Sequence, residues 1–185
     1  MKRVIGGSLF LALGGLAGVA SAVGVVEIYG ASPVVPGSQW QNWNLAPTAN
    51  SHPYALAHYL LAGRFPPATG QMREFSTQRS TDGGALTAVC DYVLVANPAP
   101  ALWWSMTAYS SGRPDQTANS VITADTAVVE SDGSLRLAVT LSPASGNWIR
   151  PPATGAFTLL YTIAEPSPSQ SHLSMPSFTV DRSGC

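Results

Sequence analysis

The sequence has almost no lysine and little charge of either sign. Lysine occurs only at Lys2, and Asp, Glu, Lys and Arg together make up 10% of the 185 residues. After Arg3, seven arginines stand against ten acidic residues, which leaves a formal charge of −3. A nucleic-acid-binding protein needs a basic patch for the phosphates, and this sequence has no basic run. The lack of lysine after Lys2 also excludes Schiff-base chemistry and P-loop phosphate binding.

Histidine and cysteine, the usual metal ligands, are equally scarce. Of the three histidines, His52 and His58 are six residues apart and lie on different faces of a helix, and His172 lies in a serine-rich stretch. Neither Cys90 nor Cys185 has ligand-like spacing to a histidine. We therefore expect no metal site and no cofactor.

Glycine, proline and apolar residues are abundant instead. The chain has 17 Gly, 15 Pro and 45% hydrophobic residues. This composition excludes a disordered polyelectrolyte and favours a loop-rich β protein over a helical bundle. A length of 185 residues favours one globular domain with a real core.

An apolar segment follows Lys2 and Arg3. Val4 to Val26 contains no charged residue and is long enough to span a hydrocarbon core as a helix. Cationic residues before such a segment predict that the rest of the chain lies outside the cytoplasm. The segment is either a retained transmembrane anchor or a signal peptide cleaved near Ala20 to Ala22. Both alternatives export the domain.

The two cysteines are predicted to pair. Cys90 lies in a strand-like run, and Cys185 is the last residue of the sequence. Outside the cytoplasm, two thiols usually form one disulfide. This one would close a loop of about 95 residues and stabilise the fold by about 4 kcal/mol. The alternative is an unreactive, buried Cys90 and a free thiol at Cys185.

The body is predicted to be mainly β. One short helix is expected from Pro53 to Ala62, with Leu56, Tyr59 and Leu60 on one face. Runs with strand character are Gln71–Gln78, Leu86–Val95, Trp103–Tyr109, Val121–Glu130, Leu135–Leu141, Phe157–Ile163 and Ser177–Val180. Turn signals occur at Asp82 to Gly84, and Asp132-Gly133 is typical of a hairpin.

These segments divide the chain into three parts. Residues 1–26 are the anchor or signal segment, 27–50 an irregular lead-in that covers part of the core, and 51–185 the β domain. Strands separated by turns every 8 to 15 residues favour an antiparallel β-sandwich of jelly-roll type.

A series of short motifs resembles a bacterial family called domain of unknown function 1214. The series consists of the run from Trp104 to Tyr109, the turn from Ser131 to Leu135, Asn147-Trp148-Ile149, and Phe157. The resemblance covers roughly residues 50–185. It implies a jelly-roll sandwich in the cell envelope. The segment Cys90-Asp91-Tyr92 and the terminal Cys185 also resemble the short members of the family, which have a single membrane anchor. The family brings no established activity, and Ser110 and Arg150 depart from its usual pattern.

The segment around Asn147, Trp148 and Arg150 is the best candidate site. An exposed Trp can stack on a sugar ring while nearby polar groups bond its hydroxyls. The alternative is a structural loop, in which Trp148 covers the sandwich end and the Asn147 amide bonds the backbone. Asp125, Glu130 and Asp132 could form a carboxylate group for glycoside hydrolysis, but turn and surface roles fit them better. Ser105 lacks a nucleophile elbow and is expected to be a strand residue.

Two functions follow from this reading. The first is a non-catalytic envelope module that binds a glycan or a partner protein through Asn147, Trp148 and Arg150. The second is an envelope hydrolase that acts on a polysaccharide or a small molecule. We favour the first, because no nucleophile or metal signature is present. The domain is expected in the periplasm, held at the inner membrane by its helix or released when the leader is cleaved.

Overall fold

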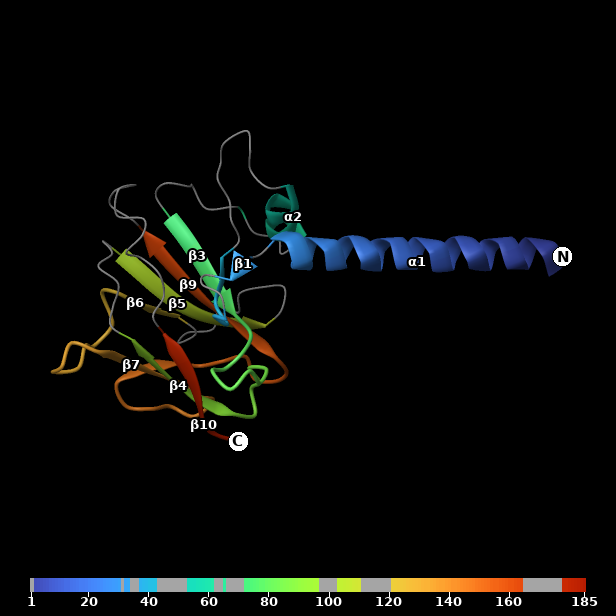
Figure 1. Ribbon diagram of the computed structural model, residues 1–185. Helices are drawn as coiled ribbons and strands as arrows, with labels where there is room; N and C mark the ends of the chain where they lie inside the picture. The colour runs from blue at the N-terminus through green and yellow to red at the C-terminus, as the bar shows by residue number, and fades with distance from the viewer. Residues whose placement is uncertain are drawn as a thin grey trace.

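The computed structural model describes residues 2–30, 32–33, 37–42, 53–61, 65, 72–96, 103–110, 121–164 and 178–185. Its body consists of two β-sheets, and two helices lie on the side of the larger one (Figure 1). The predicted mainly β fold is confirmed at this level.

The two sheets draw their strands from the whole chain. The larger sheet has the order β1 (Ser32–Pro33), β2 (Gln41–Asn42), β3 (Met72–Thr77), β9 (Phe157–Ala164), β5 (Trp103–Ser110) and β6 (Val121–Thr123). The smaller sheet has the order β10 (Thr179–Gly184), β4 (Asp91–Ala96), β7 (Leu135–Val139) and β8 (Asn147–Ile149).

The core lies between the facing surfaces of the two sheets. In β7, Leu135, Leu137 and Val139 are buried while Arg136 is exposed, which is the alternation of a strand with one wet face. The larger sheet contributes Phe75, Met106, Leu159 and Tyr161 to the same apolar cluster. The packing of these two sets makes the body a two-layer β-sandwich.

The segment predicted as an irregular lead-in contributes β1 and β2 to the larger sheet, and its Trp40 closes one part of the core. Trp40 is only 1% exposed, and its indole N–H donates to the Phe178 carbonyl oxygen at 2.9 Å. Their rings also lie in contact, with centroids 6.2 Å apart. This segment therefore joins the larger sheet through β2 and packs against the start of β10.

Two strand predictions need correction. β8 pairs with β7 in parallel, with Ala138 opposite Trp148, so the sandwich is not purely antiparallel. The turn at Asp132-Gly133 exists, and Gly133 has the positive φ that it requires. It joins β6 in the larger sheet to β7 in the smaller sheet, so it is a crossover between sheets instead of a hairpin. The jelly-roll connectivity stays a prediction.

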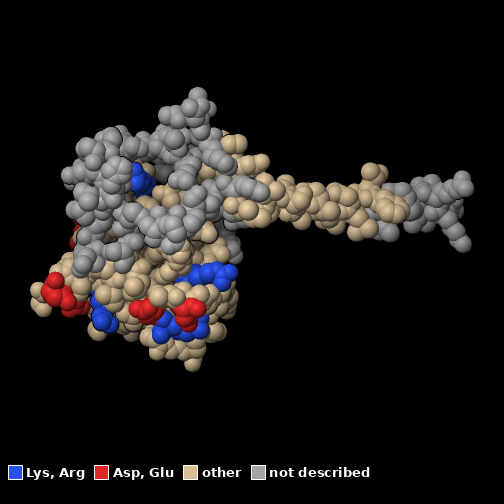
Figure 2. All heavy atoms as spheres, viewed as in Figure 1, with Lys and Arg blue, Asp and Glu red and all other residues tan. Residues whose placement is uncertain are grey.

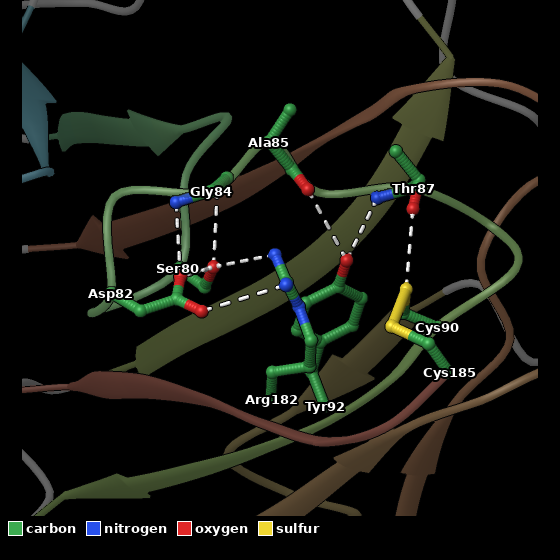
Figure 3. Close-up of a disulfide and its surroundings, with 9 residues drawn as sticks. All are labelled: Ser80, Asp82, Gly84, Ala85, Thr87, Cys90, Tyr92, Arg182 and Cys185. Carbon is green, nitrogen blue, oxygen red and sulfur yellow. Dashed lines mark hydrogen bonds and ion pairs between the residues drawn. A yellow bond between two sulfur atoms is a disulfide. The ribbon is translucent and has the colours of Figure 1, made fainter.

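The predicted disulfide joins Cys90 to Cys185. Cys90 lies directly before β4 and Cys185 directly after β10, whose ends are paired through Gly184 and Asp91. Figure 3 shows the bridge beside Tyr92, whose hydroxyl accepts from the Thr87 N–H at 2.9 Å and donates to the Ala85 carbonyl oxygen at 3.3 Å. The loop before β4 is therefore fixed both covalently and by a buried tyrosine.

The outer edge of β10 is protected as well. Thr81 bonds both the N–H and the carbonyl oxygen of Val180, and the Arg182 guanidinium lies 3.5 Å from the Asp82 carboxylate. Figure 3 shows this ion pair next to Ser80. A covered edge with paired charges does not offer a template for aggregation.

The two helices differ in how they contact the body. Helix α1 (Lys2–Gly30) projects away from the sandwich as a rod, and α2 (Pro53–Leu61) packs beside its far end (Figure 1). In α2, Ala55 and Tyr59 are buried, whereas Leu56 and Leu60 are exposed. The predicted apolar face was therefore correct for Tyr59 and wrong for the two leucines.

The helical conformation predicted for Val4 to Val26 is confirmed by α1. Over the residues that the structure describes, neither helix combines the length and the apolarity needed to cross a bilayer. The predicted membrane span therefore finds no support in these residues.

Several predictions fall on parts of the chain outside the described residues. They concern His52, His172 and positions 43–50 of the lead-in. His58 is described, and its ring contacts that of Tyr59 edge to face.

Candidate binding face of the smaller sheet

Asn147 and Trp148 lie on strand β8, where a loop was expected. Alternation along β8 sends their side chains to opposite sides of the smaller sheet. Asn147 and Ile149 are buried, and Trp148 is partly exposed. The two residues therefore cannot act together on one ligand.

The Asn147 amide is fully used by the protein. Its Oδ1 accepts from the Val128 N–H at 2.7 Å, and its Nδ2 donates to the carbonyl oxygens of Val128 and Arg136 at 2.6 and 2.9 Å. The side chain thus takes the place of a strand neighbour and closes the outer edge of β8. This geometry matches the structural alternative for Asn147, so we remove it from the candidate site.

Trp148 is held in place on the outer face of the smaller sheet. Its indole N–H donates to the Thr140 carbonyl oxygen at 2.9 Å. This bond satisfies the only polar atom of the ring and fixes its direction, and Trp148 is partly exposed to solvent. Arg150 is exposed directly after β8.

The strand register extends this face from Trp148 across all four strands. Ala138 lies opposite Trp148, Val93 opposite Ala138, and Asp181 opposite Val93. Three strand spacings separate the ends of this row, or roughly 14 Å. Ala138 and Val93 are partly exposed and small, so they leave a flat apolar surface beside the indole ring.

A second row runs parallel to the first. It consists of Arg136, Val95 and Thr179, with Val95 in the middle and the two exposed polar residues at the ends. Thr179 donates its hydroxyl proton to the Asp181 carboxylate at 3.1 Å. We call the seven residues of the two rows the Trp148 face: Trp148, Ala138, Val93, Asp181, Arg136, Val95 and Thr179.

The Trp148 face combines an apolar centre with a charged rim. In Figure 2, most of the charged side chains of the described residues lie over the lower half of the molecule, where Figure 1 places the smaller sheet. An aromatic ring beside small apolar side chains, rimmed by hydrogen-bonding groups, is a surface that binds sugars or partner proteins.

Of the three acidic residues considered for hydrolysis, Asp125 and Asp132 have structural roles, and Glu130 is exposed. The Asp125 carboxylate accepts from the Trp103 indole N–H at 3.2 Å. Asp132 accepts from the Ser134 backbone N–H in the β6–β7 turn, and hydrogen bonds from Ser134 hold the pKa of this carboxyl below its ordinary value. Within the described part of the chain, no group of three or more His, Cys, Asp or Glu residues is placed to hold a metal ion.

Sequence reasoning found Trp148 but missed most of its neighbours. Ala138, Val93 and Asp181 carry no motif and stand far apart along the chain. Alternation in β4 and β7 does place Val93 and Ala138 on the solvent face. Only the register of four strands shows that they form one surface with Trp148.

Comparisons with known proteins bear on the fold and the family. The family model described as "Protein of unknown function (DUF1214)" matches residues 71–168, more than half of the chain. The crystal structure of the VPA0106 protein from Vibrio parahaemolyticus is similar, with a TM-score of 0.59 and 11% identity, over 90% of this chain and 42% of that one. This likeness shows a shared fold.

A second solved structure is an uncharacterised protein from Burkholderia cenocepacia. It has a TM-score of 0.45 and 15% identity, over 63% of this chain and 30% of that one. The chain thus spans less than half the length of either structure. No curated protein matches the sequence.

Proposed function

Because the chain belongs to the DUF1214 family, whose function is unknown, we propose a role from its own geometry. The protein is an exported, non-catalytic module of the cell envelope that binds a glycan on the Trp148 face. The observation that carries this proposal is the row from Trp148 through Ala138 and Val93 to Asp181.

The chemistry of the row suits a sugar ring. The apolar face of a pyranose can stack on the indole of Trp148, which its bond to Thr140 holds in one orientation. Preorganised aromatic rings lose little entropy on binding. Asp181, Thr179 and Arg136 supply acceptors and donors for hydroxyl groups at both ends of the surface.

The proposal of export rests on two other observations. Helix α1 exposes large apolar side chains such as Phe10, Leu11 and Leu16, each at least 70% exposed. Soluble domains rarely expose so much contiguous apolar surface, which is typical of a segment recognised by export machinery or lipid. The Cys90–Cys185 disulfide also fits an oxidising compartment such as the periplasm.

Glycan binding is tested with soluble peptidoglycan fragments and lipopolysaccharide oligosaccharides as probes. Trp148→Ala is expected to weaken binding about tenfold or more, as at other aromatic hot spots. Trp103→Ala is the matched control, because Trp103 is also partly exposed and hydrogen bonded through its indole but lies on the larger sheet. If both folded variants bind like the wild type, the Trp148 face is not the site.

Export is tested by adding protease to spheroplasts that express the full chain. We expect the β domain to be digested or released, with its thiols blocked as a disulfide. The mass of the recovered protein then shows whether the leader is cleaved. A domain that stays inside intact spheroplasts, with both cysteines reduced, contradicts the proposal.

A further inference from the structure

Two arginines flank Trp148 on the outer face of the smaller sheet. Arg136 lies on β7, two residues before Ala138, which is opposite Trp148. Arg150 follows Ile149, whose side chain is buried, so alternation places Arg150 on the same side of the sheet as Trp148. Both arginines are exposed. Strand geometry puts each α-carbon roughly 7–8 Å from that of Trp148, a distance that an arginine side chain can bridge.

The guanidinium groups of these two residues are unpaired. Neither forms a hydrogen bond or an ion pair with the residues that the structure describes. The other arginines of the described part of the body all have a partner: Arg73 is bonded, Arg79 donates to the Gly83 carbonyl oxygen at 2.9 Å, and Arg182 pairs with Asp82. Among the described body residues, the arginines left for a ligand are therefore the two beside the indole ring.

Negative charge lies at the opposite end of the same face. Asp181 stands on β10, three strand spacings from Trp148. Asp91 is exposed on β4, two residues before Val93 and on the same side of the sheet. The face is therefore positive over β7 and β8 and negative over β10 and β4. A bound molecule with one acidic end would take a single direction on this surface.

The charge of the acidic end is limited by a further carboxylate near Arg136. Hydrogen bonds from Ser134 lower the pKa of Asp132, and the charge of Arg136 adds to this effect, although the two side chains form no direct ion pair. Part of the positive potential of Arg136 is thus already balanced. A carboxylate carries one negative charge and fits this balance better than a phosphate ester, which carries close to two.

We propose that the glycan bound on the Trp148 face is an acidic saccharide, whose carboxylate lies beside Trp148 and is bound by Arg136 and Arg150. The inference rests on the proposed function, because it names the class of ligand for that same site. A uronic acid has an apolar ring face for the indole and a carboxylate that can accept two parallel N–H bonds from a guanidinium. The uncharged part of the glycan then extends toward Asp181.

The test compares the binding of the full chain to trigalacturonic acid and to its methyl ester by isothermal titration calorimetry. The two probes differ in the charge of their carboxyl groups. We expect the acid to bind about tenfold more tightly than the ester, and added salt should reduce this preference. Arg136→Gln and Arg150→Gln should each weaken the binding of the acid by about fivefold to tenfold and leave the binding of the ester unchanged.

Arg182→Gln is the matched control, because it removes one positive charge from the same sheet at a side chain that is paired with Asp82. This variant should keep the preference for the acid. Trp148→Ala should weaken the binding of both probes, because the ring stacks on either sugar. Its effect therefore reports on the proposed glycan site, whereas the arginine variants report on the carboxylate alone.

Three results would overturn the inference. The first is equal binding of acid and ester, which leaves glycan binding on the Trp148 face intact. The second is a preference for the acid that survives in the double variant of Arg136→Gln and Arg150→Gln. The third is stronger competition against trigalacturonic acid by glucose 6-phosphate than by glucuronate, which would replace the carboxylate by a phosphate group.

Discussion

Replacing Cys185 with serine opens the disulfide to Cys90 and frees a loop of 95 residues in the unfolded chain. In the chain-entropy model, closing a loop of this length stabilises the folded state by about 4–5 kcal/mol. Cys185 is the better position to change, because its side chain is exposed while Cys90 is buried. A serine at position 185 therefore adds no buried polar group.

The assay is urea unfolding of the wild type and of Cys185→Ser, followed by tryptophan fluorescence, with reductant added for the variant. We expect the free energy of unfolding to fall by about 3–5 kcal/mol. The reduced wild type serves as the control and should match the variant. Cys90→Ser should lose more, because it also buries a hydroxyl group. A loss below about 1 kcal/mol for Cys185→Ser would refute the loop-entropy argument.

Two further predictions concern hydrogen bonds of side chains. Asn147→Ala leaves backbone groups of Val128 and Arg136 without partners, so the free energy of unfolding in urea should fall by about 2–3 kcal/mol; no loss would show that water replaces the amide. A hydrogen bond from Ser80 lowers the pKa of Asp82 below its ordinary value of 3.8. The stability that Asp82 contributes is therefore complete above that value and is lost as the pH falls through the lowered pKa. Asp82→Asn should flatten the decline of stability between about pH 5 and pH 2, and an unchanged pH profile would contradict this.

Strands with a strict alternation could be predicted from the sequence. Leu135, Leu137 and Val139 repeat every second residue, and so do Phe157, Leu159 and Tyr161. Burial of one face imposes this period directly, so β7 and β9 were found with nearly correct bounds. The short helix α2 was found through Pro53, but its buried face depended on a contact with β3 that the local sequence does not contain.

Strand β8 could not be predicted for a physical reason. It has three residues, and its pairing with β7 is parallel and comes after a loop. Local propensity carries little information on such a strand, because its stability comes from partners elsewhere. One of these partners is the backbone at Val128, which the Asn147 side chain bonds. Asparagine is typical of loops, and here it completes an edge.

The candidate site could be predicted only in part, because it also depends on pairing between strands that lie far apart in the sequence. Trp148 was singled out because an aromatic residue beside polar residues is chemically informative. Its role as one end of a row depends on the pairing of β8, β7, β4 and β10, whose residues are spread from 91 to 184.

The outer faces of the two sheets differ in burial, and this difference decides which of them a ligand can reach. On the larger sheet, Ser105 and Thr162 are each only 8% exposed, so the chain itself already covers that face. On the smaller sheet, apolar Val93 and Ala138 are partly exposed beside Trp148, so this face gains free energy when a ligand covers it. A ligand of the Trp148 face must therefore present an apolar surface to these residues and hydrogen-bonding groups to the exposed polar residues at the rim. A sugar ring meets both demands, because it has an apolar face and a polar perimeter.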